Sequence, residues 1–299
     1  MDDSLALIAE RLMPGARLLD ARRLTGGVSA VVHALDLAPR DGAPRTVVVR
    51  QLRSHAWTTP GDDPVGREFA LARAVHRAGI PVPEPLAAES DPDSPTGAFL
   101  AMAFADGTTE IPPDRLQDRL TVMARTLADI HGVAQNGLPA LPLRLDPRPE
   151  VFEFLTPDRR ALADWLAARD DTAWHDPPRL LHGDFWPGNL LWVDDTLGAV
   201  LDWEDAALGD PLSDVACTML ELTYLFGPAA AAGFAAAYRR HAPLDDARLP
   251  LWQVYVASAA ARYMGEWGLP AAREAHMRAC AQAFIDAAAD ALMTGGPVR

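Results

Sequence analysis

Residues 180–192 read Leu-Leu-His-Gly-Asp-Phe-Trp-Pro-Gly-Asn-Leu-Leu-Trp, with a polar centre between two apolar segments. Asp184 and Asn189 lie in this centre, and Asp202 follows eighteen residues after Asp184, directly behind the apolar run 199–201. Phosphoryl transfer that depends on magnesium needs one acid beside a substrate hydroxyl and oxygen ligands that hold the metal. The spacing therefore predicts Asp184 as the catalytic base and Asn189 and Asp202 as magnesium ligands.

The composition indicates a globular protein and argues against a nucleic-acid partner. With 299 residues, 49% of them hydrophobic, the chain can build one large domain or two lobes. The formal net charge is -14, and most of this excess lies after residue 100. Nucleic acids call for a basic surface, whereas an acidic one is compatible with cationic small molecules.

Two further features of the composition set expectations for location and chemistry. The start of the chain, Met1-Asp2-Asp3-Ser4, is acidic, and no apolar run approaches the roughly 20 residues that span a bilayer. We therefore expect a cytoplasmic protein without a membrane partner. Lysine is absent and all 27 Lys or Arg positions are arginine, so any phosphate contact that is usually made by lysine must here be made by arginine.

Hydrophobic periodicity predicts a small strand-rich lobe over residues 1–105 and a larger helical lobe over 106–299. The expected helices cover 4–13, 67–78, 115–131, 157–169 and most of the chain from 212 onward. The expected strands cover 31–37, 46–49 and 99–104, and a hairpin is expected over 190–193 and 197–201.

The first lobe contains the candidate nucleotide-binding residues. Gly26, Gly27 and Ser29 lie just before the expected strand 31–37, where a glycine-rich turn lets backbone amides approach phosphate oxygens. Arg50 ends the expected strand over 46–49, and Glu68 follows eighteen residues later in a helix. We expect Arg50 to hold phosphates and Glu68 to hold Arg50, although arginine is not a neutral replacement for lysine.

Other residues near the motif have structural interpretations. We expect Asp214 to be structural and to hydrogen-bond the loop that contains His182. We expect His182 to pack and hold the Asp184 loop rather than to act as a nucleophile. Four aromatic residues of the late helices can line a substrate pocket or belong to the core, and core is the commoner outcome. They are Trp252, Tyr255, Tyr263 and Trp267.

Taken together, these segments resemble the aminoglycoside phosphotransferase and choline/homoserine kinase family, small-molecule kinases with the protein-kinase-like fold. The resemblance covers roughly residues 20 to 215 and implies an α+β, two-lobed fold with a small antiparallel-sheet lobe and a larger mainly helical lobe. It also implies ATP and Mg²⁺ as cofactors, bound between the lobes, with Asp184 as base and Asn189 and Asp202 at the metal. It places the hinge at 102–105, where the backbone of Ala103 and Ala105 would meet the adenine.

Several alternatives stay open at this point. The acceptor can be an aminoglycoside, a macrolide, an amino alcohol or a sugar, the nucleotide can be ATP or GTP, and no oligomeric state is predicted. A nucleotide-binding module without acceptor turnover is a rival interpretation. A protein kinase is disfavoured, because Gly209-Asp210-Pro211 follows Asp202 too closely to leave room for a long activation segment.

Overall fold

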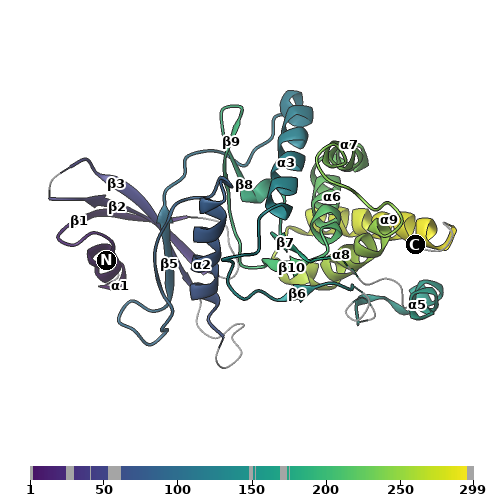
Figure 1. Cartoon of the computed structure of the whole chain (residues 1–299), viewed down its shortest axis with the longest axis horizontal. Coiled ribbons are helices and arrows are strands. Elements are labelled where there is room, and N and C mark those ends of the chain that lie inside the picture. The colour runs from purple at the N-terminus through teal and green to yellow at the C-terminus, as the bar shows by residue number, and fades with distance from the viewer. Residues whose placement is uncertain are drawn as a thin grey trace. The chain divides into compact units, whose positions relative to one another are not determined.

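Two compact units make up the protein in a computed structural model (Figure 1). The first contains Met1–Thr108, Gly137–Ala140 and Leu191–Glu204, and the second contains Thr109–Asn136, Leu141–Leu190 and Asp205–Arg299. The structure describes residues 3–24, 30–40, 42–52, 62–147, 151, 153–168, 174 and 176–294. The expected domain boundary between residues 105 and 106 stays a prediction, since compact packing does not show which segment folds alone.

An antiparallel five-stranded sheet in the order β1-β2-β3-β5-β4 forms the centre of the first unit. Its strands are β1 (Arg17–Leu24), β2 (Ala30–Ala38), β3 (Arg45–Leu52), β4 (Pro85–Glu89) and β5 (Phe99–Ala103). The predicted strands correspond to β2, β3 and β5, and the predicted antiparallel arrangement is confirmed. Val47 and Val49 of β3 are buried, as β-branched residues in a central strand usually are.

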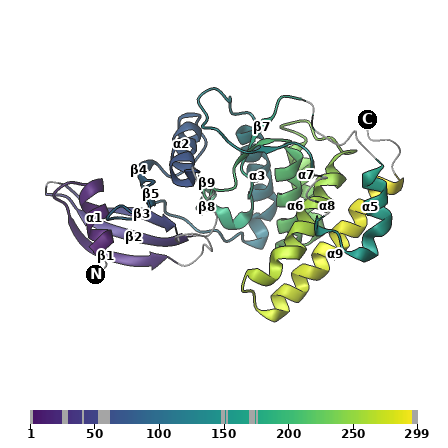
Figure 2. The same cartoon turned by 90° about the horizontal axis from the view of Figure 1, so that it is seen from below.

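Two helices pack against this sheet (Figures 1 and 2). Helix α1 (Asp3–Leu12) buries Leu5 and Ile8 in one core with Val49 and Phe99 of the sheet. Helix α2 (Pro64–Arg77) lies beside β4 and begins at Asp63, whose side chain accepts the amide hydrogen of Gly66 at 2.8 Å. Both helices agree with the predicted spans to within three residues.

The hydrophobic pattern did not predict the two edge strands, β1 and β4. In β1 the burial follows no clean alternation, so the pattern of one buried face is missing. In β4 the first residue is Pro85, and proline usually interrupts a strand. Proline is tolerated at the first position of an edge strand, because its missing N–H then faces no partner strand.

The predicted hairpin is present as β8 (Leu190–Val193) and β9 (Thr196–Val200). Asp194 takes a positive φ of 52° at its turn, as a tight hairpin requires. The backbone of Trp192 exchanges two hydrogen bonds with Thr108, at 2.8 and 2.9 Å. We expected this hairpin to belong to the helical lobe, but from Leu191 onward it packs with the first unit.

Helices dominate the second unit. They are α3 (Leu116–His131), α5 (Arg160–Ala167), α6 (Leu212–Phe226), α7 (Pro228–Tyr238), α8 (Leu249–Tyr263) and α9 (Ala271–Thr294). Helices α6, α7 and α8 stand next to one another in Figure 2, and the core includes Leu220, Leu251, Val254 and Ala281. Gly227 separates α6 from α7, which begins at Pro228, and Gly268 and Pro270 lie between α8 and α9.

A small three-stranded sheet supports the segment that contains His182 and Asp184. Strand β10 (Ala207–Gly209) pairs in parallel with β6 (Leu143–Arg144) and antiparallel with β7 (Arg179–Leu181). These strands have only two or three residues each, so none carries a periodic pattern that sequence analysis can detect. Their pairing fixes the start of the loop at His182.

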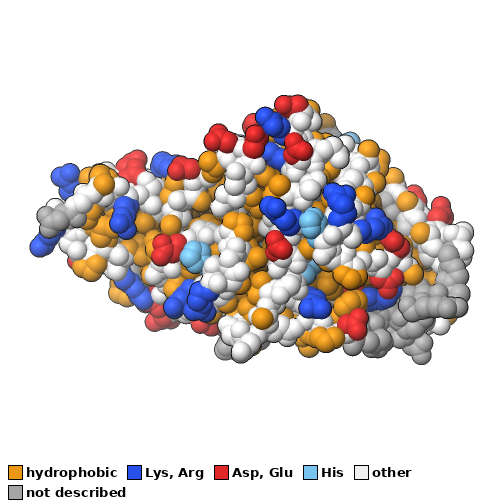
Figure 3. Space-filling view, turned by 45° about the horizontal axis from the view of Figure 1, so that its top comes forward, with side chains coloured by type: hydrophobic (Ala, Val, Ile, Leu, Met, Phe, Trp, Pro, Cys, Tyr) orange, Lys and Arg blue, Asp and Glu red, His pale blue; other side chains and the backbone are white. Residues whose placement is uncertain are grey.

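On the face in Figure 3, acidic and arginine side chains are interspersed, without one dominant patch of either sign. Among the helices that the structure describes, none is both long and apolar enough to cross a membrane.

Candidate functional site

The loop that follows β7 displays Asp184, and Gly183 gives the loop its shape. Gly183 has a φ of +90°, in the region that favours glycine. A Cβ atom at this position would lie 2.1 Å from the carbonyl oxygen of Asp205, which is backbone and cannot move aside cheaply. The His-Gly-Asp sequence therefore owes its central residue to close backbone packing.

His182 holds this loop from inside, as expected. Its side chain is fully buried and packs edge-on against Phe185, with ring centroids 5.7 Å apart. Its Nδ1 lies 3.3 Å from the backbone nitrogen of Asp184 and can accept that hydrogen. Because the ring is buried and engaged with its own loop, it stabilises the position of Asp184 rather than attacking a substrate.

Asp214 of α6 ties the same loop to the helical core. Its carboxylate accepts the backbone hydrogens of His182 at 2.7 Å and of Gly183 at 2.9 Å. Burial by itself would raise the pKa of Asp214, but hydrogen bonding from His131, the nearby histidines and the His182 amide outweigh it and lower that pKa. The predicted hydrogen bonding to the loop is confirmed.

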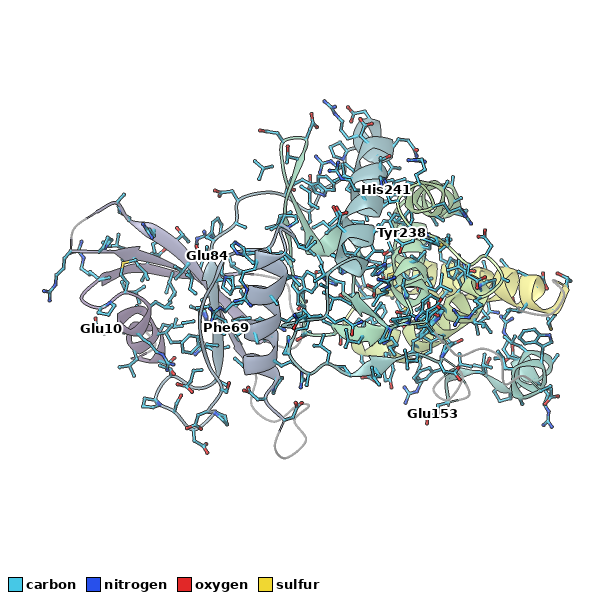
Figure 4. All side chains as sticks on the ribbon, viewed as in Figure 1. Glu10, Phe69, Glu84, Glu153, Tyr238 and His241 are labelled. Carbon is cyan, nitrogen blue, oxygen red and sulfur yellow. The ribbon has the colours of Figure 1, made fainter. Side chains whose placement is uncertain are left out.

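A buried side-chain relay extends behind Asp214. His131, the last residue of α3, places Nε2 3.2 Å from the Asp214 carboxylate and Nδ1 2.7 Å from the Tyr238 hydroxyl. Since an ionised carboxylate can only accept, we assign the ring hydrogen to Nε2, and Nδ1 accepts from Tyr238. Figure 4 labels Tyr238, at the end of α7. The sequence by itself assigned a role to neither His131 nor Tyr238. The one available signal was that His131 stands at the end of an amphipathic helix.

Asp184 and Asn189 contact each other directly. The Asn189 side-chain nitrogen donates to the carboxylate and to the backbone carbonyl of Asp184, both at 2.9 Å. This use of the nitrogen leaves the amide oxygen as the atom that a metal would bind. An amide oxygen and a carboxylate are hard ligands of the kind that Mg²⁺ prefers, so Asn189 and Asp202 fit the ion chemically.

That proposed pair is a small ligand set. Within the described ranges, no group of three or more His, Cys, Asp or Glu residues is arranged to hold a metal. Magnesium commonly takes few protein ligands and completes its coordination with phosphate oxygens and water.

In the first unit, Arg50 and Glu68 form the expected pair. Arg50 Nη1 lies 2.7 Å from both carboxylate oxygens of Glu68, and both side chains are mostly buried, at 11% and 12% exposure. One comes from the central strand β3 and the other from helix α2. The pairing is confirmed, while the role of Arg50 toward phosphate stays a prediction.

Two further carboxylates surround the same arginine. Glu204 contacts Arg50 Nη2, and a carboxylate oxygen of Asp202 lies 3.6 Å from that nitrogen. Burial lowers the pKa of Arg50, but Glu68, Glu204 and Asp202 outweigh it and raise that pKa, so the guanidinium stays charged. The forked guanidinium of arginine can hydrogen-bond carboxylates on two sides, which a lysine ammonium does less well. Glu204 lies in a turn and is partly exposed, and this contact gives its carboxylate a partner.

The backbone of Asp202 is unusual. Its φ is +61°, and among the described non-glycine residues only Asp194 and Asp202 have positive φ values. Aspartate tolerates this left-handed region better than most residues, at some cost in energy. Trp203, which is buried, donates from its ring nitrogen to the Val200 carbonyl at 3.3 Å and so braces this turn.

The protonation of Glu68 predicts a dependence of stability on pH. Burial raises the pKa of Glu68 from 4.5 to about 7; Asp202 and Glu204 act in the same direction, and Arg50 opposes them. A raised pKa means that the folded state binds the proton more tightly, so this contribution is present below about pH 4.5 and is lost as pH rises through about 7. We expect Glu68→Gln to reduce the fall in melting temperature between pH 5 and pH 8.

The control for this experiment is Glu84→Gln, since Glu84 is an exposed glutamate of the same unit (labelled in Figure 4). Melting curves of the three proteins at pH 5 and pH 8 give the comparison. An identical fall in the wild type and the Glu68 variant would contradict the prediction.

The remaining nucleotide-binding candidates have mixed outcomes. Gly26, Gly27 and Ser29 lie outside the described residues. The amide of Ala103 donates to the Glu84 carbonyl at 2.8 Å and is therefore used within the sheet. Ala105 lies beyond the end of β5, and its role toward adenine stays a prediction.

The predicted site residues thus form two sets. The first unit gathers Arg50, Glu68 and Asp202, and the second unit holds Asp184 with Asn189. Of the four late aromatic residues, Trp252 is fully buried and Tyr255 packs against the core, whereas Tyr263 and Trp267 are 43% and 37% exposed.

Curated proteins that match this chain carry acyl-CoA dehydrogenase names. Acyl-CoA dehydrogenase family member 10 of Mus musculus is 29% identical over 204 residues, which is 60% of this chain and 18% of the relative. Family member 11 of Gallus gallus is 30% identical over 193 residues, covering 56% of this chain and 24% of the relative. The chain spans about a fifth of the length of these relatives.

Solved structures share the fold over nearly the whole chain. A protein of Ralstonia eutropha JMP134, described provisionally as an aminoglycoside phosphotransferase, gives a TM-score of 0.71 at 18% identity and covers 98% of both chains. A thermostable mutant of an aminoglycoside phosphotransferase, in ternary complex with AMP-PNP and hygromycin B, gives 0.65 at 18% identity over 98% of this chain and all of that chain. Macrolide 2'-phosphotransferase type I gives a TM-score of 0.64 at 20% identity and covers 93% of this chain and 96% of that chain.

These likenesses confirm the predicted two-part α+β, kinase-like architecture. The sequence identifies the family as well as the fold, because a family model described as the phosphotransferase enzyme family matches residues 20–252. That range includes Arg50, Asp184, Asn189 and Asp202, as well as the buried Asp214 that supports the loop. The chain belongs to the phosphotransferase enzyme family.

Proposed function

We propose that this protein transfers the γ-phosphoryl group of ATP to a hydroxyl group of a small molecule, with magnesium as the metal. The observation that carries this proposal is the Asp184 loop. A partly buried carboxylate is presented there by Gly183, contacted by Asn189 and anchored to the core through Asp214. Such rigid positioning of one acid is the main contribution that a protein makes to phosphoryl transfer.

In the proposed reaction Asp184 orients the acceptor hydroxyl and receives its proton late. The acceptor oxygen forms a bond to the γ-phosphorus while the bond from that phosphorus to the β–γ bridging oxygen breaks, and ADP leaves. Bound magnesium would supply positive charge to the phosphate oxygens, and Asn189 and Asp202 would hold it. Arg50 would bind phosphate oxygens of the nucleotide, and the Ala105 amide would donate to the adenine.

Arg50 has to exchange partners in this scheme, which leads to a testable prediction. A phosphate that binds Arg50 competes with Glu204, the more exposed of its two closest carboxylates. Removing the charge of Glu204 should therefore strengthen ATP binding in the absence of magnesium. Because Glu204 is about one-third exposed, solvent screens the effect, and we expect a two- to fivefold gain, about 0.5–1 kcal/mol.

Calorimetric titration of ATP with EDTA present, into wild type, Glu204→Gln and the control Glu84→Gln, measures this gain. If Glu204→Gln binds ATP more weakly than wild type without magnesium, Glu204 does not compete with phosphate.

A screen for nucleotide consumption tests the proposed function directly. ATP or GTP is supplied with magnesium, and release of the diphosphate is measured with aminoglycosides, macrolides, amino alcohols and sugars as acceptors. Hydroxyacyl-CoA thioesters form a further arm, because the curated relatives carry acyl-CoA dehydrogenase names. Acceptor-dependent release of ADP supports the proposal.

The second candidate is a nucleotide-binding module without acceptor turnover, and arginine in the usual lysine position is the observation that favours it. ATP binding in calorimetry together with no turnover in any arm of the screen would establish this candidate. Failure to bind either nucleotide would exclude both.

A further inference from the structure

A hollow of about 220 Å³ lies in the first unit, between the end of α1 and the sheet that this helix covers. The buried Leu37 and Val47 form part of its wall, and Leu12, Met13 and Ala87 pack half-buried against the same core. The hollow is therefore a gap at the edge of the α1 core with a mainly aliphatic wall. Since an aliphatic cavity of about 150 Å³ can hold benzene, this one has room for about eight carbon atoms.

An irregularity of β4 adds another apolar side chain to this wall. Pro85 pairs with Met102 and Ala87 pairs with Ala101, so Leu86 is an extra residue in its strand, a β-bulge. Neighbouring residues of a regular strand point to opposite faces, yet Leu86 and Ala87 both line the hollow. Leu86 is 39% exposed, and an aliphatic ligand in the hollow would remove it from water.

Two arginines also line the hollow, and they differ in their partners. Arg11 of α1 contacts Glu89 and donates to the Ala88 carbonyl at 3.1 Å, so its charge is compensated. Arg45, the first residue of β3, is exposed and shares its face of the strand with Val47. Over the ranges that the structure describes, the Arg45 side chain makes neither an ion pair nor a hydrogen bond. The aliphatic wall thus ends at one uncompensated positive charge.

We propose that this hollow binds an aliphatic carboxylate of about eight carbon atoms, with the chain against Met13, Val47 and Leu86 and the carboxylate at Arg45. The two parts of such a ligand match the two parts of the site. The CH₂ groups leave water against the aliphatic wall, and a guanidinium can donate two parallel hydrogen bonds to a carboxylate. An aliphatic cation of the same length would be repelled by Arg45.

The proposed site lies on the opposite face of the sheet from Arg50. Residues of a strand alternate between the two faces, so Val47 and Val49 face the α1 core while Arg50 faces away from it, toward Glu68. Binding in the hollow should therefore leave the affinity for AMP-PNP unchanged. The inference goes beyond the proposed function and does not depend on it.

Calorimetry of the full chain with butanoate, hexanoate and octanoate tests the aliphatic part of the site. Complete burial of one CH₂ group corresponds to about a fourfold gain in affinity, so the affinity should rise about tenfold or more from butanoate to octanoate. Leu86→Gln places a polar group in the wall and should weaken the binding of both octanoate and octanol.

Arg45→Gln tests the charge. Because Arg45 is exposed and solvent screens its ion pair, this variant should weaken octanoate binding about two- to fivefold and leave octanol binding unchanged. Two matched controls change exposed residues of the same unit that do not line the hollow: Arg77→Gln at the end of α2 and Leu19→Gln in β1. Both controls should bind octanoate as the wild type does.

The Met13 methyl group reports where the ligand binds. In a sample with isotope-labelled methionine methyl groups, the Met13 resonance is the one that is missing in Met13→Leu, and octanoate should shift it. Affinity that does not rise with chain length, unweakened octanoate binding in Arg45→Gln or Leu86→Gln, or an unmoved Met13 resonance would overturn the inference. Displacement of octanoate by AMP-PNP would overturn it too, because the ligand would then occupy the nucleotide site.

Discussion

Replacing Asp184 by alanine is expected to lower acceptor turnover by about 10²-fold or more while ATP still binds. Asp184 is the acid that receives the acceptor proton in the proposed reaction; Asn189 contacts its carboxylate, and Asp214 anchors its loop through the Gly183 amide. The Asp184→Asn variant keeps the size of the side chain and a contact to Asn189, so it separates the loss of charge from the loss of packing. Both variants should lose turnover to a similar degree.

The measurement is the rate of ADP release with the best acceptor from the screen, together with calorimetric affinity for ATP. Asp290→Asn serves as the matched control, because it removes one exposed carboxylate from the same unit. Turnover within about threefold of wild type in either Asp184 variant would rule out its role as the base.

Replacing Asp214 by alanine should produce the largest loss of stability. The carboxylate accepts hydrogens from two backbone amides and from His131, and it is fully buried. Without it, these three donors lie in the interior with no acceptor, and we expect the free energy of unfolding to fall by about 3–5 kcal/mol. Urea denaturation followed by circular dichroism measures this change.

Asp214→Asn retains one acceptor oxygen and should lose less stability, which keeps the experiment informative if the alanine variant does not fold. Hydrogen exchange at the His182 and Gly183 amides should speed up in the asparagine variant. The same two amides should stay protected in Asp290→Asn. A loss of less than about 1 kcal/mol in Asp214→Ala would show that the loop does not depend on this carboxylate.

The lowered pKa of Asp214 adds a prediction about acid. A folded-state pKa below the usual value means that the contribution to stability is present at neutral pH and disappears as pH falls through the folded pKa, below about 3.8. The wild type should therefore lose stability in acid more steeply than Asp214→Asn, whose amide does not titrate in this range.

Long elements with strong periodicity were predictable from the sequence. Helix α3 and the sheet strand β3 carry regular apolar positions, and local patterns of this length decide the element type. Strands such as β7 and β10 have three residues each and exist only because they pair with one another. Strands of this length carry no local hydrophobic pattern, so β7 and β10 could not be predicted from the sequence.

The same division applies to the candidate site. The residue types and spacing of Asp184, Asn189 and Asp202 are local facts of the sequence, and so is the eighteen-residue interval from Arg50 to Glu68. The contact of Arg50 with Glu204 joins residues 154 positions apart, and the contact of His131 with Tyr238 joins residues 107 apart. Strand register and helix packing determine which residues meet in these long-range contacts, and a single sequence does not reveal either of them.

By itself, the sequence determined the order of the main elements, the polar residues available for phosphoryl transfer and the use of arginine throughout in place of lysine. It did so because helix and strand periodicity, glycine turns and charge are properties of neighbouring residues. Only the tertiary structure decided that Glu204 joins Glu68 and Asp202 around Arg50, that Asp214 anchors the Asp184 loop, and that His131 joins Asp214 to Tyr238. Those outcomes depend on burial and on contacts between distant segments, where a charge gains or loses its partner according to the packing around it.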